Sequence, residues 1–285
     1  AERPWSLQAI MWPCTVIAVA AKMAARVPTK LLLTDHIALS RQYSAPRQRL
    51  AVRTTLRLFY PKAEAVAAVS RGAAEDVERL ADLPAGSVEV IYNPMNLPDV
   101  LRGGEPVPAL WGDANPRIIT AGRLAEQKNH AVLLRAFSRL VERFPAASLV
   151  ILGDGPLRPE LEQMCRNLGI ENRVHLPGFV IDPWPLLVSA DLFVLSSDYE
   201  GMSLVIVEAL HAGLRVVSTD CVAGPAELLD GGRFGRLVPV GDEEALARGM
   251  LEELAVPKKP ERQRSRVEEI TGPRNLQRYV DLLTA

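Results

Sequence analysis

The stretch RIITAGRLAEQKNHAVLLRAF, residues 117–137, contains a complete strand–turn–helix pattern. Its first residues are largely apolar and β-branched, Gly122 permits a sharp turn, and apolar residues then recur at helical spacing. Similar short apolar runs, each with a helical stretch behind it, occur at residues 148–156, 173–179, 191–197 and 214–220. Strands that alternate with helices of this length are typical of βαβ units around a buried parallel sheet. The sequence therefore predicts an α/β, Rossmann-like domain.

The first hundred residues repeat this pattern less completely. Strand-like runs occupy residues 29–36, 64–70 and 87–93, and Ser70 is suited to cap the helix that follows it. The segment 105–116 is rich in Pro and Gly, so we interpret it as a linker between two α/β units.

The domain boundaries follow from this linker. We expect an N-terminal domain at residues 1–104, a C-terminal domain at 105–271, and a final helix at 272–285 that packs back towards the N-terminal domain. The polar stretch 256–266 is expected to be exposed.

Composition and charge narrow the class of protein. The 285 residues carry a formal net charge of −1 without a long block of one sign, which argues against a nucleic-acid-binding protein. Three well-separated cysteines without a CxxC pair favour a reducing cytoplasm over a disulfide framework. The longest early apolar run, residues 10–21, is too short to span a bilayer and lacks the basic region of a signal peptide.

Unusual residues follow each strand of the predicted second domain. Ligands of open parallel sheets bind at the carboxyl ends of the strands, so these loops are expected to line one crevice. The residues concerned are Arg123, Gly153–Gly155, Gly178–Phe179, Glu200 and Gly224–Pro225.

Arg123 and Lys128 stand just before a predicted helix in this crevice. Two cations beside helix amides can bind a phosphate group, and a solvated basic pair is the alternative. The GDGP sequence starting at Gly153 lacks the third glycine of a dinucleotide-binding fingerprint, so it offers poor support for an NAD-dependent dehydrogenase. We instead expect a tight turn there that brings the backbone close to a ligand.

The stretch YEGMSLVIVEALHA, residues 199–212, carries a carboxylate near each end of an apolar run. Ser203 is expected to cap a helix from Leu204 to about Ala212, whose first amides form an anion site. Glu200 and Glu208 could then contact different parts of one extended ligand. In the alternative interpretation, Glu208 is a paired acid in a buried helix, since burial without a donor is costly.

The remaining charged features are less specific. A strand-end histidine such as His36 is more often structural than catalytic. The other histidines have no metal-ligand spacing, so we assign no metal site. The segment 46–62 places arginines every four residues on one helix face without an acid. This face is either solvated or in contact with anionic lipid or a phosphate-bearing acceptor.

Four segments together resemble the retaining GT-B glycosyltransferases of family 4. They are AGRLAEQKNHAVLLRAF, LVILGDGPLRPELEQMCRNLGIENRVHLPGFV, ADLFVLSSDYEGMSLVIVEALHAGLRVVSTDCVAGPAELLDGG and GRLVPVGDEEALA, in the order typical of the family. The resemblance implies two Rossmann-like domains with parallel sheets facing a cleft. It also implies that the N-terminal domain here is incomplete, because the Gly-rich turn near the start of that domain is absent.

The resemblance also implies roles for individual residues. Glu200 and Glu208 correspond to the family's paired glutamates, with Glu208 on the ribose and Glu200 on the transferred sugar. Arg123 and Lys128 would neutralise the leaving diphosphate, and His36 would approach the sugar from the acceptor side. Further donor contacts would come from the backbone at Gly153, at Phe179 and Val180 beside the base, and at Met202, Ser203 and Leu204 beside the diphosphate.

By this resemblance we expect a glycosyltransferase. The cysteine usage predicts a cytoplasmic protein, and the basic face of residues 46–62 leaves open a peripheral contact with the inner face of the membrane. Its donor would be a UDP- or GDP-sugar and its acceptor a glycan or lipid-linked sugar, with no metal or other cofactor required. A GT-B nucleotide-sugar 2-epimerase and a non-catalytic nucleotide-sugar-binding protein are the alternatives. Because the N-terminal domain would be incomplete, we expect this chain to bind and turn over donor poorly compared with a longer protein.

Overall fold

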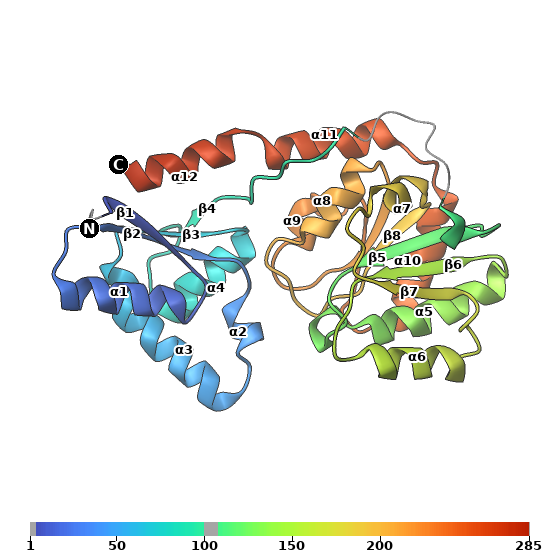
Figure 1. Cartoon of the computed structure of the whole chain (residues 1–285), viewed down its shortest axis with the longest axis horizontal. Helices are drawn as coiled ribbons and strands as arrows, with labels where there is room; N and C mark the ends of the chain where they lie inside the picture. Colours follow the sequence, from blue (N-terminus) through green and yellow to red (C-terminus); the bar gives the residue numbers. More distant parts are fainter. Residues whose placement is uncertain (1–3, 100–107, 285) are drawn as a thin grey trace.

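Two parallel β-sheets organise the chain in the computed structural model, which describes residues 4–99 and 108–284 (Figure 1). The N-terminal sheet has the strand order β1-β2-β3-β4. Its strands are β1 (Ser6–Ile10), β2 (Lys30–Asp35), β3 (Ala65–Ala68) and β4 (Glu89–Val90). Its helices are α1 (Cys14–Ala25), α2 (Leu39–Gln42), α3 (Pro46–Phe59) and α4 (Arg71–Ala81). The Ser70 hydroxyl accepts a hydrogen bond from the Ala73 amide, so the predicted cap of α4 is confirmed.

The C-terminal sheet has the order β10-β9-β8-β5-β6-β7, with parallel pairing throughout. Its strands are β5 (Arg117–Ala121), β6 (Ser148–Leu152), β7 (Val174–Gly178), β8 (Leu192–Leu195), β9 (Arg215–Thr219) and β10 (Arg236–Val238). Its helices are α5 (His130–Arg143), α6 (Arg158–Asn167), α7 (Trp184–Ser189), α8 (Leu204–His211), α9 (Pro225–Leu228) and α10 (Glu243–Ala255). The strand order reverses between β5 and β8, and ligands of open α/β sheets bind at such a switch point.

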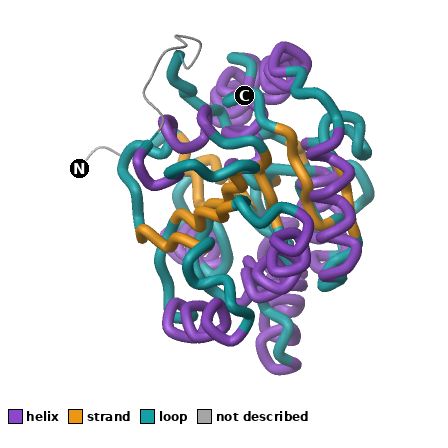
Figure 2. The backbone as a smooth tube through the Cα atoms, turned by 90° about the vertical axis from the view of Figure 1, so that its right-hand side faces the viewer, coloured by secondary structure: helices purple, strands orange, loops and turns teal. Residues whose placement is uncertain are grey.

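The core of the C-terminal domain lies on both faces of its sheet, with helices on either side of the strands (Figure 2). Neighbouring residues of one strand alternate between the two faces, as the period of a strand requires. Ile119 packs in the cluster beneath α8, and Ile118 packs in the cluster beneath α5. Such strands read as continuous apolar runs because both faces are buried.

The structure places the early apolar run and corrects the interpretation of the linker. The apolar run at residues 10–21 belongs to β1 and α1, which follow the same strand–helix pattern as the rest of the chain. The expected boundary at residues 104 and 105 lies outside the described residues. Within the described part of the expected linker, Trp111 is 2% exposed and donates its ring N–H to the Ser189 hydroxyl. Residues 108–116 are therefore attached to the C-terminal domain, because Trp111 is part of its core.

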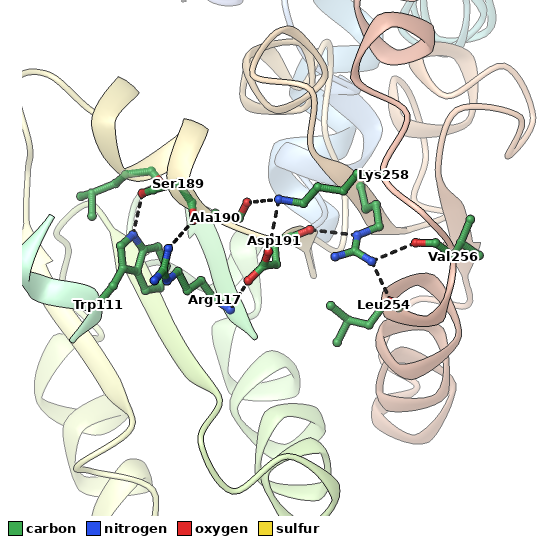
Figure 3. Close-up of polar contacts among 10 residues, drawn as sticks. Trp111, Arg117, Ser189, Ala190, Asp191, Leu254, Val256 and Lys258 are labelled. Atoms are coloured by element: carbon green, nitrogen blue, oxygen red, sulfur yellow. Dashed lines mark hydrogen bonds and ion pairs between the residues drawn. The ribbon is translucent and has the colours of Figure 1, made fainter. Parts of the chain in front are cut away.

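A polar network fastens the chain beyond α10 to the amino ends of the strands (Figure 3). The Asp191 carboxylate accepts a hydrogen bond from the Arg117 amide at 2.9 Å and lies 3.2 Å from the Lys258 ammonium group. Arg215 donates to the carbonyl oxygens of Leu254 and Val256. These contacts fix the direction in which the chain leaves the C-terminal domain.

The helices α11 (Pro260–Thr271) and α12 (Arg274–Thr284) then cross from one domain to the other (Figure 1). The expected exposure of residues 256–266 is confirmed for most of this stretch, but Gln263 is an exception because α11 packs against α8. Gln263 is buried and its amide donates to the carbonyls of Leu214 and Phe234. Further along, α12 reaches the N-terminal sheet, where Tyr279 packs in one cluster with Leu32 and Ile91.

Candidate functional site

The two domains meet at the carboxyl ends of their strands, and part of this contact is between backbone atoms. Ile37 and Gly201 form an isolated antiparallel bridge, and the Ala38 amide donates to the Glu200 carbonyl oxygen at 3.3 Å. A Cβ on Gly201 would stand 1.9 Å from the carbonyl oxygen of His36. Only glycine allows this approach, so the loop at Glu200 lies directly against the loop at His36.

Lys128 and Glu200 form a half-enclosed ion pair in this region. The Lys128 Nζ lies 2.6 Å from Glu200 Oε1, and the Ser197 hydroxyl donates to the same oxygen at 2.6 Å. The Glu200 side chain is 7% exposed and the Lys128 side chain 17%. Hydrogen bonds to a charged group in such surroundings are stronger than neutral ones, so the Lys128 and Ser197 contacts fix the orientation of the Glu200 carboxylate.

The turn that carries Lys128 is held against the strand-end loop by several hydrogen bonds. Asn129 donates its side-chain amide to the Asp198 carboxylate at 2.8 Å, and Gln127 donates to the Tyr199 carbonyl at 2.9 Å. The Ser196 hydroxyl donates to the carbonyl of Lys128. These hydrogen bonds to Gln127, Asn129 and the Lys128 carbonyl oxygen therefore fix the backbone position of Lys128.

The first turn of α8 differs from the sequence expectation. Ser203 does occupy the position before the helix, but its side chain makes no capping hydrogen bond. Its hydroxyl is buried and has no partner among the described residues. The helix itself runs from Leu204 to His211, and Gly213 follows with a φ of 77°. The open amides and the free hydroxyl leave hydrogen-bonding capacity at this helix start.

A pocket of about 350 Å³ opens at the carboxyl edge of the C-terminal sheet. Its lining includes Arg123, Gly153, Phe179, Val180 and Glu208, so residues from the loops after β5, β6 and β7 and from α8 come together there. The Phe179 side chain is 81% exposed at its rim. The predicted convergence is thus observed for Arg123, Gly153 and Phe179, whereas Glu200 and Gly224–Pro225 do not line this pocket.

Glu208 has no hydrogen-bond or ion-pair partner among the described residues. Burial raises the pKa of the Glu208 carboxyl above its ordinary value, because an ionised carboxylate loses water there. The expected protein donor for Glu208 is absent from residues 4–99 and 108–284. Arg123, which lines the same pocket, is exposed and also has no side-chain partner in those ranges. Among the described residues, the carboxyl group of Glu208 and the guanidinium of Arg123 in this pocket are thus both unpaired.

We expected the glycines of the GDGP turn to let the backbone approach a ligand. In the structure, they are required for a different reason. A Cβ on Gly153 would stand 2.2 Å from the Gly122 carbonyl oxygen, and one on Gly155 would stand 2.4 Å from the Leu124 carbonyl oxygen. Both glycines are therefore required by the close packing of this turn against the loop that carries Arg123.

His36 lies at the end of β2, with its Nε2 atom buried and without a partner among the described residues. Burial lowers the pKa of His36, so its imidazole is neutral at pH 7. In the parts of the chain that the structure describes, His, Cys, Asp and Glu side chains form no group of three suited to hold a metal ion.

Sequence reasoning missed the residues that set the positions of others. Ser197 ends a predicted strand and Asp198 follows it, so their polarity was the available signal. Glu227 gave no such signal, because its partners belong to the other domain. Both Glu227 carboxylate oxygens are engaged across the domain contact, one by the Arg71 amide at 2.8 Å and one by the Tyr92 hydroxyl at 2.5 Å.

Two Rossmann-like domains whose strand ends meet define the GT-B fold. A family model described as Glycosyl transferases group 1 matches residues 115–255, and one described as Glycosyltransferase Family 4 matches residues 9–98. The chain belongs to the family 4 GT-B glycosyltransferases.

Relatives and solved structures agree with this assignment. The chain is 34% identical, over 68% of its length and 52% of the relative, to the Campylobacter jejuni N-acetylgalactosamine-N,N'-diacetylbacillosaminyl-diphospho-undecaprenol 4-alpha-N-acetylgalactosaminyltransferase. It is 36% identical, over 47% of its length and 38% of the relative, to the Rhizobium meliloti lipopolysaccharide core biosynthesis glycosyltransferase LpsE. The chain thus spans about half or less of the length of these curated relatives. Anabaena HepE, solved in complex with UDP, shares the fold with a TM-score of 0.80 and 23% identity over 98% of this chain and 78% of that chain.

Proposed function

We propose that the chain transfers a sugar from a nucleotide-diphosphate donor to a glycan or lipid-linked acceptor. The observation that carries this proposal is the pocket in which Arg123 and Glu208, the latter on α8, have no side-chain partner among the described residues. A nucleoside diphosphate supplies what both lack, hydroxyl donors for the carboxylate and anionic oxygens for the guanidinium. The names of the Campylobacter and Rhizobium relatives support an acceptor of cell-surface type.

Each part of the donor then has an assigned contact. Glu208 accepts hydrogen bonds from the ribose hydroxyls, and the backbone at Phe179 and Val180 meets the base. Arg123, together with the amides from Met202 to Leu204 and the free Ser203 hydroxyl, holds the diphosphate. On the acceptor side, His36 faces the transferred sugar and remains neutral, so it adds no competing charge.

The Lys128–Glu200 pair acts in the sugar-transfer step. Sugar transfer passes through a cationic, oxocarbenium-like state while negative charge grows on the leaving diphosphate. Lys128 stabilises that growing charge, and Glu200 orients the sugar hydroxyls through its fixed carboxylate. Because fixed cations and helix amides supply this stabilisation, we propose that turnover needs no metal. We also propose that the anomeric configuration is retained, by substitution on the same face without a covalent intermediate.

The test is release of nucleoside diphosphate from UDP- and GDP-sugars in the presence and absence of glycan or lipid-linked acceptors. We expect release that depends on acceptor, survives a chelator, and yields a product with the donor's anomeric configuration by NMR. We expect Arg123→Ala to weaken donor binding, while Arg143→Ala, a change at an exposed arginine on α5, leaves it unchanged. Sugar conversion without acceptor would instead identify a 2-epimerase, and binding without any release would identify a nucleotide-sugar-binding protein.

We further propose that α3 brings the chain to an anionic membrane surface at the cytoplasmic face. Arg47, Arg49 and Arg53 are exposed on α3. Leu50 and Leu58 are exposed among them by 67% and 56%. Basic and apolar side chains on one helix face suit the interface of an anionic bilayer. Within residues 4–99 and 108–284, no helix is both long and apolar enough to cross a membrane.

Cosedimentation with lipid vesicles tests the membrane contact. We expect binding to vesicles that contain anionic lipid, with a loss when Arg49 and Arg53 are both changed to Gln. Equal binding to neutral vesicles would contradict the proposal.

A further inference from the structure

The loop from Val222 to Glu227 touches both the candidate site and the other domain. The Glu200 amide donates to the Val222 carbonyl at 3.2 Å, and Tyr199 and Val222 form a parallel bridge. Gly224 lies so close to the Glu200–Gly201 turn that a Cβ there would stand 2.7 Å from the Gly201 carbonyl oxygen. A movement of this loop therefore moves Glu200.

At its other end, this loop runs into α9, whose Glu227 contacts the N-terminal domain. One carboxylate oxygen accepts from the Arg71 amide at the start of α4, and the other accepts from the Tyr92 hydroxyl. The Arg71 guanidinium lies 3.5 Å from the carboxylate. A carboxylate at a helix start is favoured by the free amides and by the helix dipole. Burial and the neighbouring carboxylate raise the pKa of Tyr92, so its hydroxyl is protonated and donates.

Glu227 is itself held firmly within the C-terminal domain. Arg266 on α11 donates to the carbonyl oxygens of Glu227 and Leu228. The Glu227 side chain is 14% exposed, so water competes weakly for its oxygens. Resting on the glycosyl transfer proposed above, we propose that Glu227 is an interdomain latch and a positioning residue for Glu200. By holding the domains closed it keeps the Glu200 peptide between the Ala38 amide and the Val222 carbonyl.

The latch is expected to affect turnover but not donor binding. Arg123, Phe179 and Glu208 all belong to the C-terminal domain, so the donor pocket does not depend on domain closure. Glu200 depends on closure, because one of its two backbone hydrogen bonds comes from Ala38 in the N-terminal domain. Loss of the latch should therefore lower kcat more than it lowers donor affinity.

The experiment compares Glu227→Gln and Tyr92→Phe with two matched controls. A glutamine at 227 presents one oxygen and one N–H₂ group to two donors, so one contact is lost. Glu243→Gln is the first control, since Glu243 also binds two donors, Arg135 and Arg139, within one domain. Tyr279→Phe is the second, because its hydroxyl donates to the Ile91 carbonyl oxygen rather than to Glu227.

Two measurements decide the proposal. Small-angle X-ray scattering of the ligand-free proteins should show a larger radius of gyration for Glu227→Gln and Tyr92→Phe than for the wild type and both controls. With donor and acceptor, kcat should fall about tenfold for the two latch variants, the scale of one charged hydrogen bond, at nearly unchanged donor affinity. An unchanged radius in both latch variants, or a donor affinity that falls as much as kcat, would overturn the latch. The scattering comparison needs no turnover, so it decides the latch even if the proposed reaction is wrong.

Discussion

The carbonyl oxygen of His36 occupies the space that a side chain on Gly201 would need. The distance from that oxygen to an ideal Cβ on Gly201 is 1.9 Å, far inside van der Waals contact. A strand end of the N-terminal domain thus presses directly on the loop that carries Glu200. The domain contact and the candidate site therefore share the loop that carries Glu200. A substitution that alters the domain contact should also change turnover.

Gly201→Ala is expected to push the two domains apart. The added methyl group meets backbone atoms of His36 and Ile37, which cannot rotate away. We expect turnover to fall by about 100-fold, the usual effect of displacing a reacting group by about 1 Å, while the protein remains folded. Steady-state turnover and near-ultraviolet circular dichroism check this. Gly272→Ala is the control, because its nearest atom is 3.4 Å from the added Cβ, and equal loss of turnover in both variants would contradict the prediction.

Removing Lys128 alone should cost more stability than removing the whole ion pair. Lys128→Ala leaves the buried Glu200 carboxylate with the Ser197 hydroxyl but no cation, at a cost of about 3 kcal/mol. The double variant Lys128→Ala, Glu200→Gln should recover most of this loss. Urea unfolding provides the measurement. In comparison, Glu261→Gln removes a pair whose acid is 91% exposed and should change the free energy of unfolding by less than about 0.5 kcal/mol.

Glu208→Gln should stabilise the protein at neutral pH while weakening donor binding. The raised pKa of Glu208 means that the folded state disfavours its ionised form, so its contribution to stability falls as the pH rises through that pKa. A glutamine avoids this cost because it carries no charge. It also removes the charged acceptor for the hydroxyls of the nucleotide-sugar donor, and we expect this loss to reduce the affinity for the donor about tenfold. Thermal melts at several pH values and calorimetric titration with UDP check both parts. The gain in melting temperature should vanish at acid pH, and a gain that persists there would contradict this explanation.

His130 should make the protein sensitive to mild acid. Burial, and secondly the neighbouring Lys128, lower the pKa of His130 to about 4, below its ordinary value of 6.5. Between these values the unfolded chain binds a proton that the folded protein does not, so stability is fully present above 6.5 and falls towards pH 4. The loss amounts to about 3 kcal/mol. Relative to His130→Gln, the wild type should lose this amount between pH 7 and pH 4 in urea unfolding, and parallel curves would show that His130 does not titrate.

Much of the fold could be predicted, because strands and helices of this type carry local patterns. Residues 117–137 contain a buried strand, a turn and an amphipathic helix, and the structure has β5 and α5 at those places. The convergence of Arg123, Gly153 and Phe179 on one pocket was also predictable. Parallel strands end at one edge, so residues that follow different strands become neighbours.

The contacts of individual side chains could not be predicted in the same way. Ser203 has the right residue type for a cap, but its hydroxyl makes no capping hydrogen bond. Trp111 stands in a segment with the composition of a linker, yet it is buried because the C-terminal core offers it a place. The glycines at 153 and 155 are required by a neighbouring loop, which the sequence of their own turn does not reveal.

The sequence by itself therefore determined the two-domain α/β architecture and the edge at which the candidate site lies, since both follow from periodicity and chain direction. Only the tertiary structure decided that Lys128 pairs with Glu200, that His36 abuts Gly201, and that Glu227 joins the domains. These contacts link residues 72, 165 and 156 positions apart. Pairing over such separations depends on how whole domains pack, and no local pattern encodes that packing.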